Sequence, residues 1–238
     1  MKTVHYAWLA LLGAAAILTG AVSPGSAGQQ PAKSRVRAAS RPAPASGADA
    51  PDRTGFIQRW LILEPIPVAP QLTDSAVQAV VNKQYFPNQF TALPHDRDTV
   101  SVADQSLTWH AVDTSDYNVN LFHFASALNK PTSNVLFWAV TVVVAPRDMP
   151  NLRLAIGSNA ASVWWLNGEE VIGLYNDRQT VIDDGVSKRV TLKKGPNVIR
   201  AAIVNAGGAT DFCARFLDAD DNAVQGIEVK LDANPYNP

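Results

Sequence analysis

The stretch Ser162-Val-Trp-Trp-Leu-Asn-Gly-Glu-Glu-Val-Ile-Gly-Leu174 decides the fold. The dipeptide Asn167-Gly168 is the strongest short signal for a two-residue hairpin turn, because both positions of a type I′ turn need a positive φ. The runs on either side of it, 162–166 and 169–174, contain the Val, Ile and Trp residues that strands favour. The stretch therefore predicts a β-hairpin.

Short strand-forming runs separated by turn signals continue on both sides of this hairpin. Residues 135–144 are apolar almost without interruption, which predicts a central strand covered on both faces. Gly157-Ser-Asn159 and Lys193-Lys-Gly-Pro196 are predicted to be turns. We therefore expect the second half of the chain to be a meander of consecutive strands. The remaining expected strands are 59–63, 99–102, 107–112, 119–125, 152–156, 188–192, 197–205, 212–217 and 224–229.

One helix interrupts the predicted strands. Thr73 or Asp74 can cap it, apolar residues recur at helical spacing over 76–81, and Phe86-Pro87 ends it. Many short strands with regularly spaced turns and one early helix are typical of an all-β fold. The sequence predicts a jelly-roll β-sandwich with one short helix near its N-terminal side.

The chain is divided by composition into four parts. Residues 1–27 carry an early Lys2, an apolar run and the small residues Gly25-Ser-Ala27, which predicts a secretory signal peptide, with a buried helix or membrane anchor as the alternative. Residues 28–53 are rich in Pro, Ala and Ser and predict a flexible tether. The sandwich domain is expected over 54–232, followed by a tail at 233–238. We therefore expect a secreted or periplasmic protein that does not span the membrane.

Composition limits the classes of partner and of cross-link. The formal net charge is −1, so no strong field favours nucleic acid, and we expect no nucleic-acid partner. Charged residues make up only 17% of the chain and apolar residues 47%, which indicates a well-buried core. Cys213 is the single cysteine, so no intramolecular disulfide can form, and its apolar neighbours predict an inert buried thiol.

No catalytic pattern emerges from the sequence. The nucleophile motif Gly-x-Ser-x-Gly is missing. If a serine hydrolase were assembled from separate strands, the candidates would be Ser158 or Ser187 with His110 or His123. We expect hydrogen-bonded structural roles for both histidines. The prediction leans against an enzyme and assigns no catalytic residue.

Acidic residues offer no strong metal pattern either. The pairs Glu169-Glu170 and Asp183-Asp184 are explained by turns. Asp218-Ala-Asp-Asp-Asn222 begins like a calcium loop, but Ala223 and Val229 stand where an EF-hand needs Gly and Glu. We therefore expect no cofactor and no metal site, with a structural calcium ion held between loops as the open alternative.

Aromatic residues give the one candidate binding site. Trp164 and Trp165 are adjacent in a predicted strand, so they point to opposite faces of the sheet. One indole could then lie in a groove and stack on a sugar ring, whereas the alternative is that both are covered. The loop Tyr175-Asn-Asp-Arg178 adds an aromatic ring and hydrogen-bonding groups. The predicted carbohydrate-binding residues are Trp164, Trp165, Tyr175, Asn176, Asp177 and Arg178.

The order of these strands resembles galactose-binding-like jelly-roll modules. The resemblance rests on the entry run 56–67, on Leu154-Ala-Ile-Gly-Ser-Asn159, on the hairpin run 163–168, on the run 192–198 and on Asp211-Phe-Cys-Ala-Arg-Phe216. The sequence is similar to the accessory module found with bacterial acetyl xylan esterases. That resemblance implies a β-sandwich, a polysaccharide or oligosaccharide ligand such as xylan, and a partner hydrolase.

Three functions stay open on this basis. The first is an exported, non-catalytic carbohydrate-binding or accessory module associated with the breakdown of plant polysaccharide. The second is an acetyl xylan esterase-type hydrolase. The third is a structural or protein-interaction sandwich with no sugar site. The first function is preferred over the other two, and this preference rests largely on analogy of fold.

Overall fold

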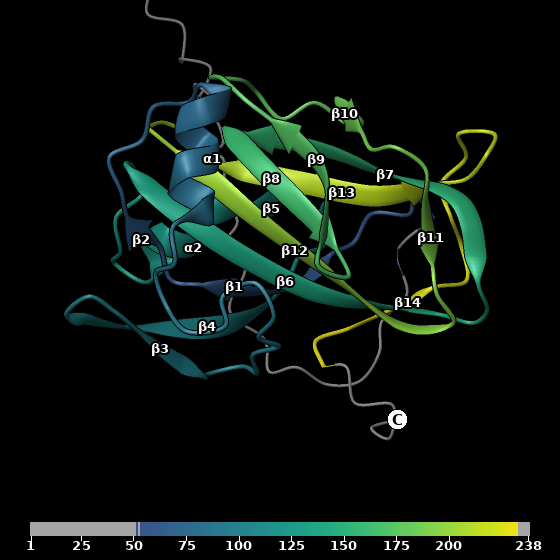
Figure 1. Ribbon diagram of the computed structural model, residues 1–238, viewed down its shortest axis with the longest axis horizontal. Helices are drawn as coiled ribbons and strands as arrows, with labels where there is room; N and C mark the ends of the chain where they lie inside the picture. The colour runs from purple at the N-terminus through teal and green to yellow at the C-terminus, as the bar shows by residue number, and fades with distance from the viewer. Residues whose placement is uncertain (1–50, 52, 233–238) are drawn as a thin grey trace, which may run out of the picture. The chain divides into compact units, whose positions relative to one another are not determined.

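The computed structural model describes residue 51 and residues 53–232, which form two antiparallel β-sheets and two short helices (Figure 1). Within these residues the larger sheet has nine strands, and its main path runs β3-β4-β1-β6-β12-β8-β9. The smaller sheet has five strands, with the path β10-β7-β13-β5. The prediction of an all-β sandwich is confirmed. The strands of the larger sheet are β1 (Arg59–Leu63), β2 (Ile66–Pro67), β3 (Thr99–Val102), β4 (Gln105–Asp113), β6 (Val135–Ala145), β8 (Ala161–Leu166), β9 (Glu169–Leu174), β12 (Gly195–Asn205) and β14 (Glu228–Lys230). Those of the smaller sheet are β5 (Val119–Asn120), β7 (Met149–Asn159), β10 (Gly185–Val186), β11 (Val190–Leu192) and β13 (Asp211–Leu217).

Strand β6 lies at the centre of the larger sheet and is covered on both faces, as its continuous apolar sequence predicts. Alternate residues such as Phe137 belong to the core between the two sheets. The residues between them, such as Trp138, belong to a second core on the other face. A strand that is apolar on both faces can pack against a hydrophobic layer on each side of its sheet. The larger sheet is therefore the middle layer of three.

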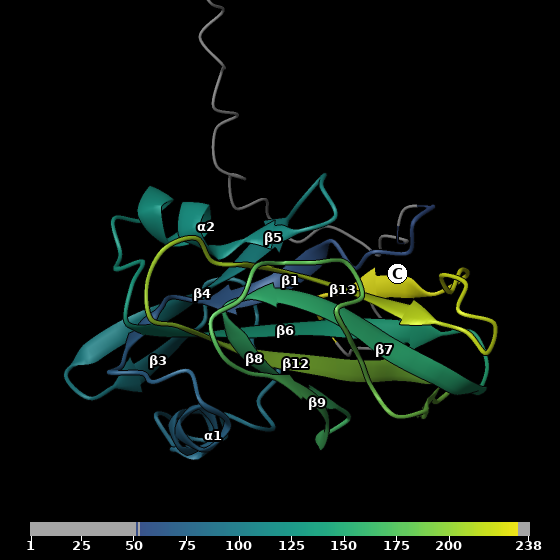
Figure 2. The ribbon, with the colours of Figure 1, turned by 90° about the horizontal axis from the view of Figure 1, so that it is seen from above.

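The third layer is built from helix α1 (Asp74–Asn82) and the chain that surrounds it. Figure 2 shows α1 on the side of the larger sheet opposite β13, β5 and α2. Val77 and Val81 are the buried residues of α1, and they pack in the second core. The predicted helix is confirmed, although it ends at Asn82 rather than at Phe86-Pro87. Thr73 is its N-cap residue, but the Thr73 side chain makes no capping hydrogen bond. This layer positions the candidate site.

The predicted meander is wrong, because consecutive strands change sheets. After β6 the chain crosses to β7 in the smaller sheet and returns for β8 and β9. It then crosses to β10 and β11, returns for β12, and crosses again to β13. Only β8 and β9 form the predicted local hairpin. Gly157-Ser-Asn159 is likewise not a turn but the end of β7, paired with β13. Crossing between sheets lets one chain cover both sides of a single core.

The strand predicted over 119–125 is also only partly right. Strand β5 ends at Asn120, and helix α2 (Leu121–Ala127) follows at once. The Asn120 side chain caps this helix by accepting a hydrogen bond from the His123 backbone N–H at 2.8 Å. The apolar residues Leu121, Phe124 and Ala125 form the buried face of this helix. In the sequence they resemble the apolar positions of a strand, so the capping role of Asn120 was not recognised.

The described residues leave several predictions untested. The predicted signal peptide at 1–27, nearly all of the predicted tether at 28–53 and the predicted tail at 233–238 lie outside them. Within them, neither helix is long and apolar enough to cross a membrane. Cys213 is a free, buried thiol as predicted, and burial raises its pKa to about 12.

Candidate ligand-binding site

A pocket of about 310 Å³ opens on the α1 face of the larger sheet, between residues 90–93 and the turn that joins β8 to β9. One wall is the chain that follows α1, and the other is the hairpin turn. The floor is strand β12, which lies next to the central strand β6. The lining residues are Phe90, Thr91, Leu93, Asn167, Gly168, Val198 and Arg200.

The apolar wall of the pocket is a supported aromatic ring. Phe90 is half-buried and meets Trp138 and Trp165 edge-on, with ring centroids 5.5 and 5.9 Å apart. Edge-to-face packing of this kind fixes the orientation of a ring. Leu93 adds an aliphatic side chain that is 37% exposed. The pocket therefore presents to solvent part of the Phe90 ring, whose orientation is fixed by the two tryptophans.

The turn wall supplies polar groups in a fixed conformation. Asn167 and Gly168 have φ of +52° and +86°, as the hairpin prediction requires. The Asn167 side chain donates to Asn197 Oδ1 at 3.0 Å and accepts from the Val198 backbone N–H at 2.8 Å. These bonds hold the exposed amide in place and leave its second N–H for a ligand.

The floor of the pocket contains a buried cation. Arg200 is 3% exposed, and its Nη2 donates to the Ala92 backbone oxygen at 2.6 Å. Its Nη1 is buried without a hydrogen-bond partner, and no ion pair of Arg200 occurs among the described residues. Burial lowers the pKa of the guanidinium to about 10, so the group stays charged at neutral pH. Arg200 therefore ties the 90–93 segment to the sheet at an electrostatic cost.

Trp164 and Trp165 point to opposite faces, as predicted, and both are covered. Trp164 is fully buried between the two sheets, where it packs edge-on against Trp60 and Phe212. Trp165 is 7% exposed and lies in the second core beneath Phe90. A stacking platform needs an exposed ring, so neither indole can serve as one in this conformation. The partly exposed ring on this face is Phe90, which the sequence analysis missed.

The loop Tyr175-Asn-Asp-Arg178 is mostly engaged within the protein. The Tyr175 hydroxyl accepts from Gln78 on α1 at 2.9 Å, and Arg178 pairs with Asp184. The Asn176 backbone N–H donates to Leu72. Asn176 and Asp177 themselves are exposed. Tyr175 thus lies beside α1, and none of the four residues lines the pocket.

The serine and histidine candidates do not come together in the described residues. Ser158 is buried and bonds to the Ala160 oxygen and the Ser162 hydroxyl. Ser187 is held by backbone groups of β7 and its own loop. His110 contacts Glu64 at 3.4 Å, and His123 is exposed on α2. None of the contacts of Ser158, Ser187 and His110 joins a serine to a histidine, so the assembled hydrolase has no geometric support.

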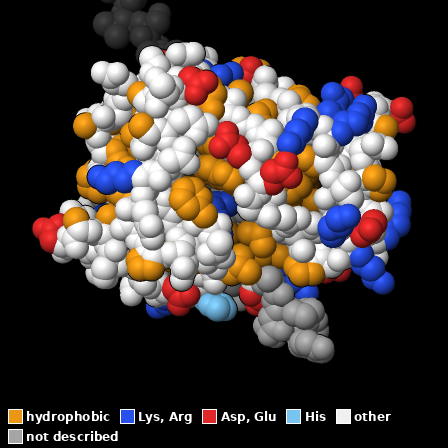
Figure 3. Space-filling model, in the orientation of Figure 1, with side chains coloured by type: hydrophobic (Ala, Val, Ile, Leu, Met, Phe, Trp, Pro, Cys, Tyr) orange, Lys and Arg blue, Asp and Glu red, His pale blue; other side chains and the backbone are white. Residues whose placement is uncertain are grey.

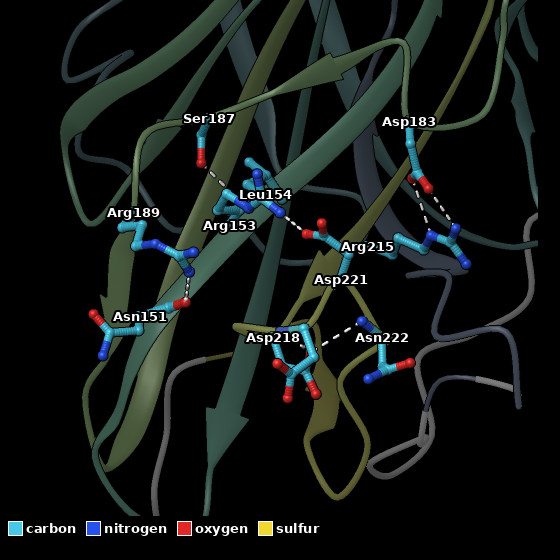
Figure 4. A network of polar contacts seen from close by, with 11 residues as sticks. Asn151, Arg153, Leu154, Asp183, Ser187, Arg189, Arg215, Asp218, Asp221 and Asn222 are labelled. Carbon is cyan, nitrogen blue, oxygen red and sulfur yellow. Dashed lines mark hydrogen bonds and ion pairs between the residues drawn. The ribbon is translucent and has the colours of Figure 1, made fainter.

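The acidic loop after β13 is part of a structural network (Figure 4). Asp218 accepts the backbone N–H groups of Asp220 and Asn222 at 2.9 Å each. Asp221 pairs with Arg153, and Asp183 pairs with Arg215. These contacts occupy the carboxylates, and no cluster of three or more potential metal-ligating side chains occurs within the described part of the chain.

Comparison with known proteins gives similarities of fold only. No protein-family model matches the sequence, and no curated protein matches it significantly. The PA14 sugar-binding domain of an RTX adhesin is similar at a TM-score of 0.42 and 10% identity, over 72% of this chain and 96% of that one. The epithelial adhesin 9 A domain of Candida glabrata, solved with Galβ1-3GlcNAc, is similar at 0.39 and 13% identity, over 82% and 99%.

A third similar structure is a β-glucosidase from Kluyveromyces marxianus, with a TM-score of 0.40 and 17% identity. The match covers 74% of this chain and only 20% of the enzyme. None of these three structures is described as an acetyl xylan esterase. With TM-scores below 0.5, no function follows from these similarities. The candidate site therefore rests on its own geometry.

Proposed function

We propose that this protein is a non-catalytic carbohydrate-binding or accessory module, and that a sugar ring binds in the pocket against Phe90. The observation that carries the proposal is the fixed, half-buried Phe90 ring beside the polar turn Asn167-Gly168. A sugar has an apolar face of C–H groups and a rim of hydroxyls. A concave site with one held ring and a few placed polar groups suits both.

The setting that we propose is extracytoplasmic. The predicted signal peptide and tether support export, and the resemblance to modules found with acetyl xylan esterases suggests xylan-type polysaccharide and a partner hydrolase. The missing nucleophile motif and the separated serines and histidines favour binding over hydrolysis. The residues Asn176 and Asp177, being exposed, remain proposed secondary contacts for a longer glycan.

Calorimetric titration of the full-length protein with xylo-oligosaccharides and galacto-oligosaccharides tests the proposal. Acetate release from acetylated xylan should be followed in the same samples. Saturable binding that Phe90→Ala weakens at least tenfold, without acetate release, would support it. Tyr85→Ala is a matched control, because Tyr85 is a half-buried ring on the same layer outside this pocket. An equal loss of glycan affinity in Phe90→Ala and Tyr85→Ala would contradict the assignment of this pocket as the sugar-binding site.

A protein-interaction sandwich is the second candidate function. All five tryptophans of the described residues are covered, which removes the strongest sugar platform. Val181, Ile182 and Val186 are exposed at 55%, 44% and 39% on the loop and short strand beside β7. If no glycan binds, and Val181→Ser abolishes capture of a protein partner, this second function would replace the first.

A further inference from the structure

A basic groove adjoins the candidate sugar pocket on the other side of the Asn167-Gly168 turn. Its volume is about 530 Å³, and it lies between the end of β8, strand β9 and strand β11. Asn167 lines both hollows, so they lie on either side of the same turn. Val171 and Val190 of the groove pack against the core between the sheets, whereas Phe90 and Val198 of the pocket pack against the core on the other face. The other residues lining the groove are Leu166, Glu169, Val171, Lys188, Arg189, Val190, Thr191 and Lys193.

Cations outnumber carboxylates around this groove. Lys188, Arg189 and Lys193 line it, and Lys194 and Arg147 lie on the two turns at its end. The two turns are adjacent, because the Lys194 backbone N–H donates to Asp148 Oδ1 at 2.8 Å. Figure 3 shows basic side chains gathered at the right-hand end of this face. The carboxylates on the same segments are Glu169, Glu170 and Asp148, and Glu170 accepts a hydrogen bond from Gln78 on α1.

Most of this positive charge is not neutralised within the protein. Lys188 pairs with Glu169 at 2.6 Å, but the two side chains are 62% and 69% exposed. Such a pair is weak and exchanges readily with another anion. Arg189 donates to a backbone oxygen of Asn151 and not to a carboxylate. Lys193, Lys194 and Arg147 are exposed, and no ion pair of theirs occurs in the described part of the chain.

This concentration of charge stands out because the whole chain has a formal net charge of −1. The groove is also mostly polar and adjoins a pocket with an aromatic wall. A single small anion would fill neither hollow. A polymer that carries both apolar ring faces and regularly spaced negative charges would fit both hollows together.

We infer that the glycan is an acidic polysaccharide, with uronic acid carboxylates facing Lys188, Arg189 and Lys193 while a neighbouring ring packs on Phe90. This inference rests on the proposed sugar-binding function and names its substrate class. The chain of the glycan crosses the Asn167-Gly168 turn. Lys194 and Arg147 extend the positive surface beyond the groove and add long-range attraction.

Binding of polygalacturonate to the full-length protein, compared with its methyl-esterified form, tests the inference. Esterification removes the charge and leaves the sugar rings in place. We expect at least tenfold tighter binding of the acidic form at 0.05 M salt, falling steeply toward 1 M, where the Debye length shrinks to about 3 Å. The double variant Lys193→Gln/Lys194→Gln should weaken acidic binding about tenfold. Lys83→Gln, an exposed lysine at the end of α1 outside both hollows, should leave it unchanged.

The outcomes separate the inference from the proposed function. If both forms bind equally and the double variant has no effect, while Phe90→Ala weakens both, the acidic-glycan inference fails and sugar binding stands. If neither form binds, the proposed function fails as well. If a random single-stranded oligonucleotide binds as tightly as polygalacturonate with the same dependence on Lys193 and Lys194, the surface is a general polyanion site and the inference is overturned.

Discussion

Replacing Arg200 with Met is expected to stabilise the protein. The guanidinium is 3% exposed, has one hydrogen bond to a backbone oxygen and faces no carboxylate in the described residues. Burial lowers its pKa from 12.5 to about 10. At 1.36 kcal/mol for each pH unit, that fall corresponds to about 3 kcal/mol of unfavourable free energy when the group is charged. Met keeps most of the aliphatic volume and removes the charge.

The variant also loses a charge-assisted hydrogen bond to Ala92, which is worth about 1.5 kcal/mol. The net gain is therefore about 1 to 2 kcal/mol in the free energy of unfolding, or a rise of about 3 to 6 °C in Tm for a domain of this size. Because the folded pKa lies below the unfolded one, the penalty is complete below pH 10 and disappears only as the pH rises beyond it. The gain should thus be the same at pH 6 and pH 8.

Urea unfolding followed by tryptophan fluorescence measures this difference. The midpoint should rise while the slope m stays unchanged. Arg189→Met is the matched control, since Arg189 is exposed and donates to a backbone oxygen; its effect should stay within about 0.5 kcal/mol. If the free energy of unfolding of Arg200→Met fell by more than 1 kcal/mol, the reasoning would be refuted. Such a fall would mean that the guanidinium is fully paired in the folded protein.

Three further changes test other parts of the fold. Gly157→Ala should destabilise by about 2 kcal/mol or more in denaturant unfolding, since a Cβ there would lie 2.1 Å from the Val181 backbone oxygen; Gly168→Ala, whose Cβ meets no atom within 4 Å, isolates the cost of a positive φ. Trp164→Ala should cost about 3 to 5 kcal/mol, and a stable variant with lost glycan binding would contradict its burial. The pKa of the Glu64 carboxyl is lowered, because Lys130 and other donors outweigh the burial that would raise it. Its stabilisation is present above pH 4.5 and lost as the pH falls below, so unfolding curves of Glu64→Gln and the parent should converge in acid.

Local sequence signals predicted the parts of the fold that depend on neighbouring residues. The β8–β9 hairpin follows from Asn167-Gly168, whose positive φ values the structure confirms. Strand β6 follows from its unbroken apolar run, because a strand buried on both faces needs no polar residue. Helix α2 was missed, since its start depends on a single cap at Asn120 that interrupts an alternating pattern.

Pairing between distant strands could not be predicted in the same way. Nothing near Leu154 indicates that β7 leaves the sheet of β6 and pairs with β13, because that choice depends on residues about sixty positions away. The candidate pocket was missed for a similar reason. One signal was available, since Arg200 is a lone charge within the apolar run of β12. Phe90, by contrast, lies in a segment without periodicity, and only the packing of Trp138 and Trp165 beneath it gives it a role.

The pairing of β6 also sets the order of events during synthesis. β6 is hydrogen-bonded to β1 and β2, which emerge before it, and to β12 and β14, which emerge long after it. The middle layer therefore cannot be completed until residues 228–230 have been made. Nascent chains released before that point would expose the apolar faces of β6 to chaperones and proteases, and they would not accumulate as a smaller folded unit. A C-terminal truncation that removes β12 should for this reason give insoluble protein rather than a partial sandwich.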